Sequence, residues 1–381
     1  MRESLAYVET IKSLSPIPKA DKIECAQILG WECVVKREEF AVGDKAIYVE
    51  IDSILPDLPP FEFLRSKKFR IRTIKLRSQV SQGIVFPLSI INEIDPTFDI
   101  SKLKVGDDVT QLLGITKYDP ESALDIVIDP EPQVKKSWAA RKFQFIKWKL
   151  FGYKPIKSHG DFPDCCPKTD ETRVQHMQGS LERNEGMPAY ITEKCDGTSS
   201  TFIYRKNGNW LSRLFGRGYT FQVCSRNRIL FSTDKNHNKP DHPIMKMADK
   251  YDILKGMKRL NRNLAIQGET IGNKIQGNLY KINGHDLKVF LIYDIDAKRY
   301  LPLDEMQQII DELNLSMVPF IGFDVVKPDI KYWVELSKGT SKLLPSVLRE
   351  GIVMRGTKDD FSFKSINPEY LLKQELNKDK E

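Results

Sequence analysis

The first 116 residues consist of short apolar runs separated by turn residues, and this spacing constrains the fold more than any other feature of the chain. The runs are LAYVETI, ECAQILGWECVV, KAIYVEI and GIVFPL, and Pro, Gly and Asp lie between them. The turn-like triplet VGD recurs at residues 42–44 and 105–107. Short strands with frequent turns predict a small closed β-barrel over residues 1–116.

The segment FRIRTIKLR in this first part alternates basic and apolar residues. A period of two places the charged side chains on one face of a strand and the apolar side chains on the other. We therefore expect a buried apolar face and a basic face that is either solvated or in contact with nucleic acid. The basic residues are Arg70, Arg72, Lys75 and Arg77, and the apolar residues are Ile71, Ile74 and Leu76.

Residues 117–160 are predicted to form a linker, because the stretch DPESALDIVIDPEPQ is rich in Pro and Asp. The stretch that follows, residues 135–154, contains bases and no acid, and its aromatic residues fall on one face of a helix. Such a helix docks two domains together, binds RNA phosphates while stacking bases, or lies on a membrane surface. The aromatic residues of that face are Trp138, Phe145, Trp148 and Phe151.

Residues 161–381 mix strand and helix patterns, which predicts an antiparallel α+β domain. AYITEK and STFIYRKNGNWL are typical of strands, and Asn207-Gly208 is a strong hairpin turn signal. KVFLIYDI is a continuous apolar strand, whereas DEMQQIIDELNL has the apolar spacing of a helix. Near the end, REGIVMRG and DFSFKSIN are predicted to be two strands joined by a turn.

Charge and cysteine content narrow the class of protein. The 59 basic and 52 acidic residues leave a formal charge of +7, which favours a polyanionic partner. The six cysteines form no C-x-x-C pair and have no His at zinc spacing, so neither a disulfide framework nor a zinc site is indicated. The N-terminus has no apolar signal core, and no apolar run approaches the roughly 18 residues of a membrane span. We therefore expect an intracellular, cytoplasmic protein without a membrane partner.

The stretch ITEKCDGTSS, residues 191–200, places Lys194 in a turn beside Asp196 and Gly197. An ordinary hairpin would explain these residues, because Gly and Asp favour turns and Lys is common at strand ends. Five further stretches then follow in order: CSRN with Arg226, QGETIGNKIQG with Glu269, FLIYDI with Phe290, EGIVMRG with Glu350, and SFKSIN with Lys364. The order of the six stretches is more informative than any one of them.

This order resembles the collinear motifs of the covalent nucleotidyltransferases, which include DNA ligases, RNA ligases and mRNA capping enzymes. Only 14 residues, 368–381, follow Asn367, too few for the barrel that DNA ligases and capping enzymes carry after the last motif. The barrel-like segment instead comes first, with SPIPKADKIECAQILGWECVVKREEFAVGD and FRIRTIKLRSQVSQGIVFPL. Together with FPDCCPKTDETRVQ and SFKSINPEYLL, it resembles the RNA ligase 5 family.

The resemblance implies an N-terminal OB-like β-barrel over residues 1–116, a linker over 117–160 and an α+β antiparallel-sheet nucleotidyltransferase domain of ATP-grasp-like ligase type over 161–381. It implies an ATP-dependent RNA ligase that uses Mg²⁺ or Mn²⁺. Its partner would be RNA with 3′-OH and 5′-phosphate ends, in a nicked duplex, and the enzyme would act as a monomer.

By the same resemblance Lys194 is the nucleophile that takes AMP from ATP. Glu269, Glu350 and Asp196 would hold the metal or its waters, and Arg226 and Lys364 would contact phosphate. Phe290 would stack on adenine, and Glu193, Asp196, Gly197 and Glu269 would also line the nucleotide site. Attack requires a neutral amine, so the pKa of Lys194 is expected to be lowered by a dry pocket, by cations such as Lys364 and Arg226, and by a metal.

One departure from the family concerns the last motif. Many superfamily members have two lysines spaced K-x-K, whereas Lys364 stands alone between Ser362 and Ile366. Either one lysine suffices or another cation, Lys168 or Arg173, substitutes. Other readings also remain open from the sequence: a DNA or mixed-strand ligase, a capping-type guanylyltransferase, and a non-catalytic RNA-binding protein, since the barrel loosely resembles tRNA-binding modules.

Overall fold

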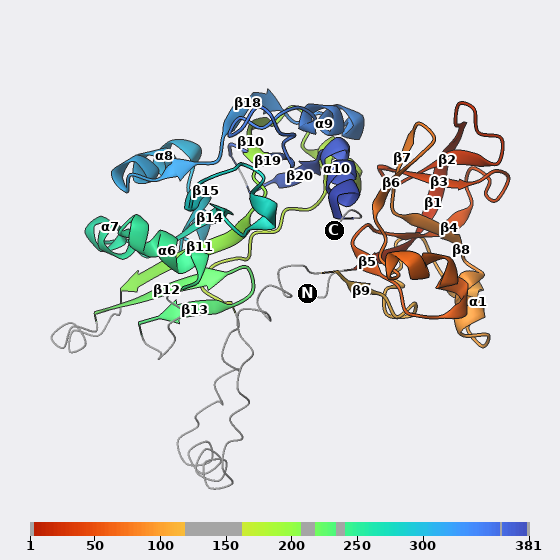
Figure 1. Ribbon diagram of the computed structural model, residues 1–381, viewed down its shortest axis with the longest axis horizontal. Helices are drawn as coiled ribbons and strands as arrows, with labels where there is room; N and C mark the ends of the chain where they lie inside the picture. The colour runs from red at the N-terminus through yellow and green to blue at the C-terminus, as the bar shows by residue number, and fades with distance from the viewer. Residues whose placement is uncertain (1–3, 119–161, 207–217, 234–240, 359, 379–381) are drawn as a thin grey trace, which may run out of the picture.

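Two bodies of regular structure make up the chain in the computed structural model, which describes residues 4–118, 162–206, 218–233, 241–358 and 360–378. Figure 1 shows strands β1 to β9 in one body, β10 to β20 in the other, and helix α10 between them. The predicted basic helix, residues 135–154, and the turn Asn207-Gly208 lie outside the described residues. The domain limits 1–116, 117–160 and 161–381 stay predictions.

The N-terminal body is a barrel-like sheet with strand order β3-β2-β1-β4-β8, and its end strands β3 and β8 contact each other. Alternation along β3 points Trp31, Cys33 and Val35 inward, which gives the barrel its apolar interior. The predicted OB-like barrel is therefore confirmed. Its strands and helices are β1 Ala6–Pro16, β2 Ile23–Ile28, β3 Trp31–Lys36, β4 Lys45–Val49, β5 Ser53–Ile54, η1 Pro59–Lys67, β6 Thr73–Leu76, β7 Gln79–Gln82, β8 Ile84–Pro87, α1 Ile90–Ile94, η2 Ile100–Lys102 and β9 Thr116–Lys117.

The predicted orientation of FRIRTIKLR is wrong. Ile71 is buried as expected, but Ile74 and Leu76 of β6 are exposed, at 43% and 39%. Arg70 and Arg72 precede the strand, and their side chains are only 10% and 17% exposed. Burial of these guanidinium groups is offset by ion pairs with Asp52 and with Glu375 of the C-terminal body, which strand periodicity alone does not indicate.

The C-terminal body contains two antiparallel sheets, which confirms the predicted α+β class. One has strand order β18-β10-β19-β20, and the other has order β13-β12-β11-β14-β15-β16, with β17 pairing in parallel with β15. Its elements are η3 Val174–His176, α4 Gln178–Arg183, β10 Pro188–Lys194, β11 Thr198–Lys206, β12 Tyr219–Ser225, β13 Ile229–Ser232, α6 Pro243–Lys250, α7 Ile253–Leu260, β14 Leu264–Gly272, η4 Gln276–Asn278, β15 His285–Asp294, β16 Arg299–Tyr300, α8 Leu303–Glu312, β17 Ser316–Met317, β18 Phe320–Val325, α9 Ile330–Ser337, β19 Gly351–Gly356, β20 Ser362–Ile366 and α10 Pro368–Lys378.

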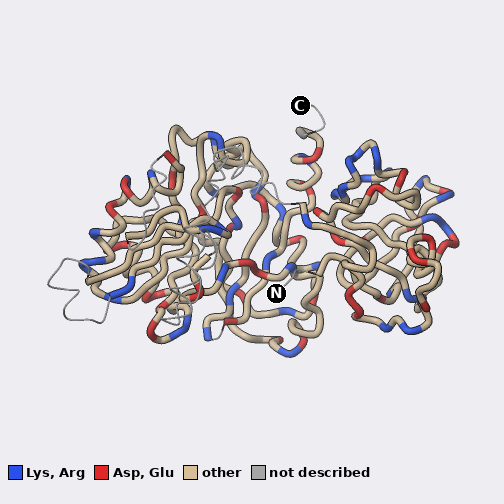
Figure 2. The backbone as a smooth tube through the Cα atoms, turned by 90° about the horizontal axis from the view of Figure 1, so that it is seen from below, with Lys and Arg blue, Asp and Glu red and all other residues tan. Residues whose placement is uncertain are grey.

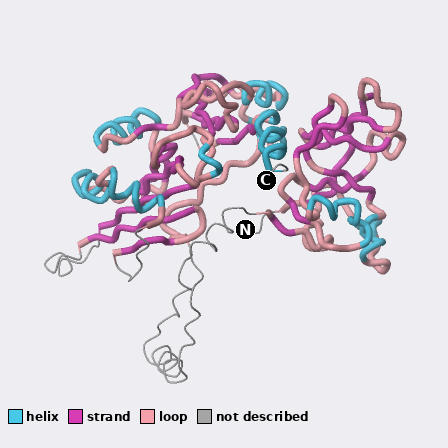
Figure 3. Tube along the Cα trace, viewed as in Figure 1, coloured by secondary structure: helices cyan, strands magenta, loops and turns pink. Residues whose placement is uncertain are grey.

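Helices cover the sheets from outside, and Figure 3 shows the strands gathered between them. Residues of α6, α7 and α8 pack with those of the larger sheet in one apolar cluster, whereas Ile330 and Trp333 of α9 pack on the smaller sheet. The helix predicted from DEMQQIIDELNL is α8, with Met306 and Ile310 buried. The two strands predicted near the end are β19 and β20, which pair antiparallel.

Basic and acidic residues are interspersed along both bodies, as Figure 2 shows. Among the described residues, no helix combines the length and the apolarity that a membrane crossing requires.

Candidate active site

Lys194 stands at the end of β10, where the strand enters the turn toward β11. Its Nζ atom lies 2.6 Å from Oε1 of Glu350, the residue just before β19. The two strands are neighbours, with Lys194 opposite Gly351, so the sheet register holds the pair together. The structure thus joins two predicted site residues that are 156 positions apart in the chain.

The pKa of Lys194 is raised, the opposite of the direction expected from the sequence. Burial lowers the pKa, but the carboxylates of Glu350, Glu269 and Asp196 outweigh burial and raise it above its ordinary value. The described residues around Lys194 therefore favour the protonated amine. A nucleophilic amine requires that positive charge from elsewhere oppose these carboxylates.

The turn after Lys194 is fixed by two buried tyrosines. The backbone N–H of Asp196 donates to Tyr280 Oη at 2.8 Å, and Tyr370 Oη donates to Asp196 Oδ2 at 2.6 Å. Gly197 packs against β14, because a Cβ atom there would lie 2.5 Å from the carbonyl oxygen of Thr270 and 2.7 Å from Cγ of Glu269. A glycine at this position lets the turn approach β14 closely.

Lys364 and Arg226 share one carboxylate. Lys364 Nζ lies 2.6 Å from Oδ1 of Asp170, and Arg226 NH2 lies 2.7 Å from Oδ2 of the same residue. These cations lower the pKa of Asp170 more than burial raises it. Lys364 is in β20 and Arg226 follows β12, so Asp170 links the two sheets through the two predicted phosphate-binding cations.

Of the two substitute cations considered from the sequence, Arg173 lies beside Lys364. The two residues form a parallel bridge, and the charge of Arg173 adds to burial in lowering the pKa of Lys364. Lys168 instead donates from Nζ to Asn227 Oδ1 at 3.0 Å.

Glu269 lies in β14 opposite Ser199 of β11, close enough to Lys194 to raise its pKa. Phe290 of β15 is half-buried against Tyr280 and Val318, and the guanidinium carbon of Arg355 lies 5.8 Å from its ring centroid. Contact between Phe290 and adenine stays a prediction.

Glu193 is on the opposite face of β10 from Lys194, because side chains alternate along a strand. Its Oε2 atom accepts from the backbone N–H of Lys342 at 2.8 Å, and Oε1 is buried without a hydrogen-bond partner among the described residues. Burial raises the pKa of this carboxyl. The side chain of Glu193 is therefore not part of the cluster around Lys194.

The cluster has a donor set that suits Mg²⁺ or Mn²⁺. Oε2 of Glu350 is buried and has no hydrogen-bond partner in the described part of the chain, which leaves a carboxylate oxygen available. Within the described residues, no group of three or more His, Cys, Asp and Glu side chains could hold a metal by themselves. The free oxygen of Glu350 suits Mg²⁺, which commonly binds through one or two carboxylates together with waters and substrate phosphates.

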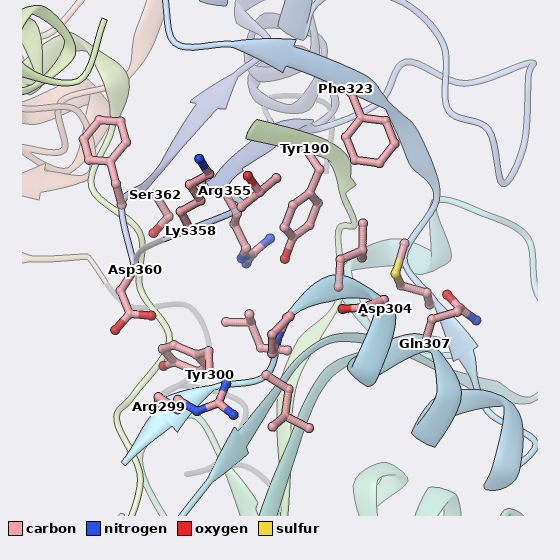
Figure 4. Close-up of a pocket in the computed structure, with 18 of the residues that line it drawn as sticks. Tyr190, Arg299, Tyr300, Asp304, Gln307, Phe323, Arg355, Lys358, Asp360 and Ser362 are labelled. Carbon is pink, nitrogen blue, oxygen red and sulfur yellow. The ribbon is translucent and has the colours of Figure 1, made fainter. Parts of the chain in front are cut away.

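A cavity of about 860 Å³ adjoins the cluster through Arg355. The NH1 atom of Arg355 lies 3.5 Å from Oγ1 of Thr192, a residue of the same strand as Lys194. Arg355 also lines the cavity. Figure 4 shows Tyr190 and Arg355 facing the cavity from one side and Arg299 and Tyr300 across from them. None of the predicted site residues, all of which are described, is among the residues that line it.

Sequence reasoning missed three residues of this site: Asp170, Tyr280 and Tyr370. Asp170 lies in KTDETR, where only the cations drew attention, and its pairing with Lys364 spans 194 positions. The tyrosines follow Lys194 by more than 80 positions and carry no motif of their own, so only the folded structure reveals them.

Two family models match the chain. An OB-fold domain model matches residues 5–88, and an RNA ligase model matches residues 187–366. A comparison with curated proteins found no match.

Solved structures of the RNA ligase of Naegleria gruberi are similar to the chain over nearly its whole length. A mutant with ATP and Mn has 33% sequence identity and a TM-score of 0.75, covering 97% of this chain and 98% of that one. The ligase with PPi also has 33% identity and a TM-score of 0.75, covering 99% of this chain and 100% of that one. A mutant with AMP and Mn has 33% sequence identity and a TM-score of 0.74, covering 97% of this chain and 99% of that one. The chain therefore belongs to the RNA ligase family, an enzyme family, as its sequence predicted.

Proposed function

We propose that this protein is an ATP-dependent RNA ligase that seals 3′-OH and 5′-phosphate ends of RNA in a nicked duplex, acting as a monomer. The observation that carries the proposal is the placement of Lys194 at the end of β10, 2.6 Å from Glu350 and on the same sheet as Lys364. The bound molecules of its relatives, ATP, AMP, Mn and PPi, support the same chemistry.

Three displacements at phosphorus make up the proposed reaction. Nζ of Lys194, as the neutral amine, bonds to the α-phosphorus of ATP and gives up one proton, while the bond to the β-phosphate oxygen breaks and pyrophosphate leaves. An oxygen of the RNA 5′-phosphate then bonds to that phosphorus; the bond to Nζ breaks, Nζ takes up a proton, and an adenylylated RNA end results. Finally the 3′-OH attacks the RNA phosphorus, loses its proton and releases AMP.

The described side chains divide this work by charge. Lys364 and Arg226 would stabilise the negative phosphoryl oxygens in the transition state, since Asp170 holds both and Lys364 is close enough to Lys194 for their charges to interact. Glu350, with Glu269 and Asp196 close by, would hold Mg²⁺ or Mn²⁺, which when bound neutralises phosphate charge. Phe290 would supply an aromatic face for adenine.

The first test is covalent labelling. The protein is incubated with ATP labelled at the α-phosphate and a divalent metal, and then run on a denaturing gel. We expect label on the wild type and on Lys206→Ala, a control at a half-buried lysine that ends β11 and donates to the carbonyl oxygen of Asn261, and none on Lys194→Ala. If the wild type retains no label with Mg²⁺ or Mn²⁺, or with GTP in place of ATP, the ligase proposal fails and RNA binding without catalysis becomes the better reading.

The second test addresses the substrate. Nicked duplexes with RNA ends and with DNA ends compete for the labelled enzyme, and transfer of AMP to each 5′-phosphate is measured. We expect RNA-ended nicks to be sealed preferentially. Equal sealing of DNA-ended nicks would instead support the mixed-strand ligase, and label from GTP alone would support a guanylyltransferase.

A further inference from the structure

Helix α10, Pro368–Lys378, is wedged between the two bodies of the protein. In Figure 1 it stands on the side of the C-terminal body that faces strands β6 and β7, and it contacts β6. Leu371 packs against the apolar core of the N-terminal body, although it belongs to the C-terminal one. The helix therefore touches both parts of the molecule.

The side of α10 toward the active site contacts the turn after Lys194. Tyr370 is 4% exposed, and its hydroxyl donates to Asp196 Oδ2 at 2.6 Å. Gln374, one helical turn later, donates from Nε2 to the hydroxyl of Tyr370 and reaches Asp196 Oδ2 at 3.4 Å. The carboxylate of Asp196, two residues after the lysine, is thus oriented by side chains of α10.

The other side of α10 is bound by arginines of the N-terminal body. Glu375 lies 3.2 Å from NH2 of Arg70 and 3.1 Å from NH1 of Arg72, and its side chain is 15% exposed. Arg70 is itself held by Asp52 at 2.6 Å and lies over the ring of Tyr118, 3.8 Å from its centroid. Glu375 therefore meets an anchored group, and its partners do not belong to the catalytic sheets.

The contact of Tyr370 with Asp196 and that of Glu375 with the two arginines are made by the same helix, so they are rigidly connected. Tyr370 and Glu375 are five positions apart, which corresponds to roughly 7.5 Å along the axis and roughly 140° around it. The helix thus presents one residue to Asp196 and the other to the N-terminal arginines. A shift of either body has to move the helix or break one of these contacts.

We propose that α10 couples the position of the N-terminal domain to the turn that carries Lys194, with Tyr370 and Glu375 as positioning residues. The catalytic consequence rests on the proposed function, in which Lys194 is the nucleophile. When Arg70 and Arg72 hold Glu375, Tyr370 holds Asp196 in the orientation that the first chemical step requires. When the N-terminal domain moves away, the turn loses this constraint.

The coupling itself is tested without ATP, by hydrogen–deuterium exchange of residues 194–198 in the full-length protein. We expect Glu375→Gln, at the domain boundary, to speed exchange in this turn at least threefold. Glu369→Gln, the same substitution at an exposed position of the same helix, is expected to leave exchange unchanged. Equal exchange in Glu375→Gln and the wild type would overturn the coupling, whatever the enzyme does with ATP.

The catalytic consequence is tested by the single-turnover rate of covalent labelling. Tyr370→Phe removes only the hydroxyl, and we expect a rate about tenfold lower with less than a twofold change in KM for ATP. Tyr332→Phe is the matched control, because its hydroxyl also donates to a carboxylate, that of Asp324, which lies opposite Ala189 at the other end of β10 from Lys194. A wild-type rate in Tyr370→Phe would remove the catalytic role, whereas absence of label on the wild type would refute the ligase proposal.

The double variant separates one shared path from two independent effects. If Glu375 acts through Tyr370, then Tyr370→Phe combined with Glu375→Gln slows labelling about as much as either change alone, roughly tenfold. A decrease of about a hundredfold, the product of two independent effects, would overturn the shared path.

Discussion

At the scale of single residues, Gly197 makes a strict steric demand in the site. Its missing side chain leaves room for the carbonyl oxygen of Thr270, a backbone atom that cannot rotate away. We expect Gly197→Ala to move the turn off β14 and to slow labelling at least tenfold. Gly322→Ala in β18 is the control, since a Cβ there meets nothing within 4 Å. The labelling rate at saturating ATP decides the outcome, and equal rates in both variants would show that the turn tolerates displacement.

The sequence predicted the site residues that lie in recognisable motifs. It did not predict the residues that hold those side chains in place. Lys194 and Glu350 lie in motifs with the expected order, and the structure joins them. Asp170 and Tyr370 were not predicted, because an acid in a loop and a tyrosine in a helix have ordinary roles until folding places them against charged partners. The direction of the Lys194 pKa shift was also missed, since it depends on distances to three carboxylates.

At the scale of elements, the segment before η3 is tied to β19 by one ion pair. Glu171 lies 2.5 Å from Arg355, and the side chains are 15% and 7% exposed. Burial raises the pKa of Glu171, but the charge of Arg355, together with a backbone hydrogen bond and the charges of Lys364 and Lys194, lowers it below its ordinary value. Because Glu171→Gln leaves the Arg355 charge buried without its partner, we expect the free energy of unfolding to fall by about 3–5 kcal/mol near neutral pH.

The pH dependence of this loss has a defined sign. A carboxylate whose pKa is depressed in the folded state stabilises the fold above its unfolded pKa, roughly 4.3 for Glu, and loses that contribution as the pH falls through the folded pKa. The difference in unfolding free energy between wild type and Glu171→Gln, measured by urea titration, should therefore shrink below about pH 4. A difference that stays constant down to pH 3, or an equal loss in the exposed control Glu185→Gln, would contradict the ion-pair explanation.

Element prediction followed the strength of the local pattern. Strands β10, β11, β19 and β20 and helix α8 lie where the apolar spacing placed them. The stretch containing Arg70 and Arg72 did not follow its period of two, because Glu375 and Asp52 compensate the buried guanidinium groups. A sequence pattern shows which residues are apolar. It does not show that a helix some 300 positions away supplies an ion-pair partner.

At the scale of the whole molecule, the two bodies meet at a second contact, on the turn between β2 and β3. The backbone N–H of Gly30 donates to the carbonyl oxygen of Gln175 at 3.0 Å, and a Cβ at Gly30 would lie 2.9 Å from that oxygen and 2.6 Å from Cδ1 of Ile330. We expect Gly30→Ala to separate the bodies here, at a cost of about 1–3 kcal/mol.

Two measurements check this expectation. Small-angle X-ray scattering should give a larger radius of gyration for Gly30→Ala, and thermal unfolding should occur at a lower temperature than for the wild type. Gly322→Ala serves again as control, because it lies away from the N-terminal body. An unchanged radius of gyration and an unchanged unfolding temperature would show that the contact yields to the added methyl group.

The order of the two domain types was predicted from the sequence, but their relative placement was not. Barrel and ligase motifs follow one another along the chain, which is sufficient for the order. The placement depends on a small number of polar contacts, such as His176 with Glu50 at 2.9 Å and Arg72 with Glu375. Each of these residues taken alone resembles an ordinary surface residue, so no local pattern distinguishes it.

The position of β10 inside its sheet has a consequence for how the protein folds. β10 comes first in the chain among the strands of that sheet, yet both of its neighbours, β18 and β19, follow it by more than 100 positions. The entropy of closing such long loops is lost before any strand pairing can compensate for it, and this slows folding. We therefore expect this sheet to assemble late. On the ribosome, the strand that ends in Lys194 would emerge well before its partners, and it would wait with both edges unpaired until the last strands of the chain arrive.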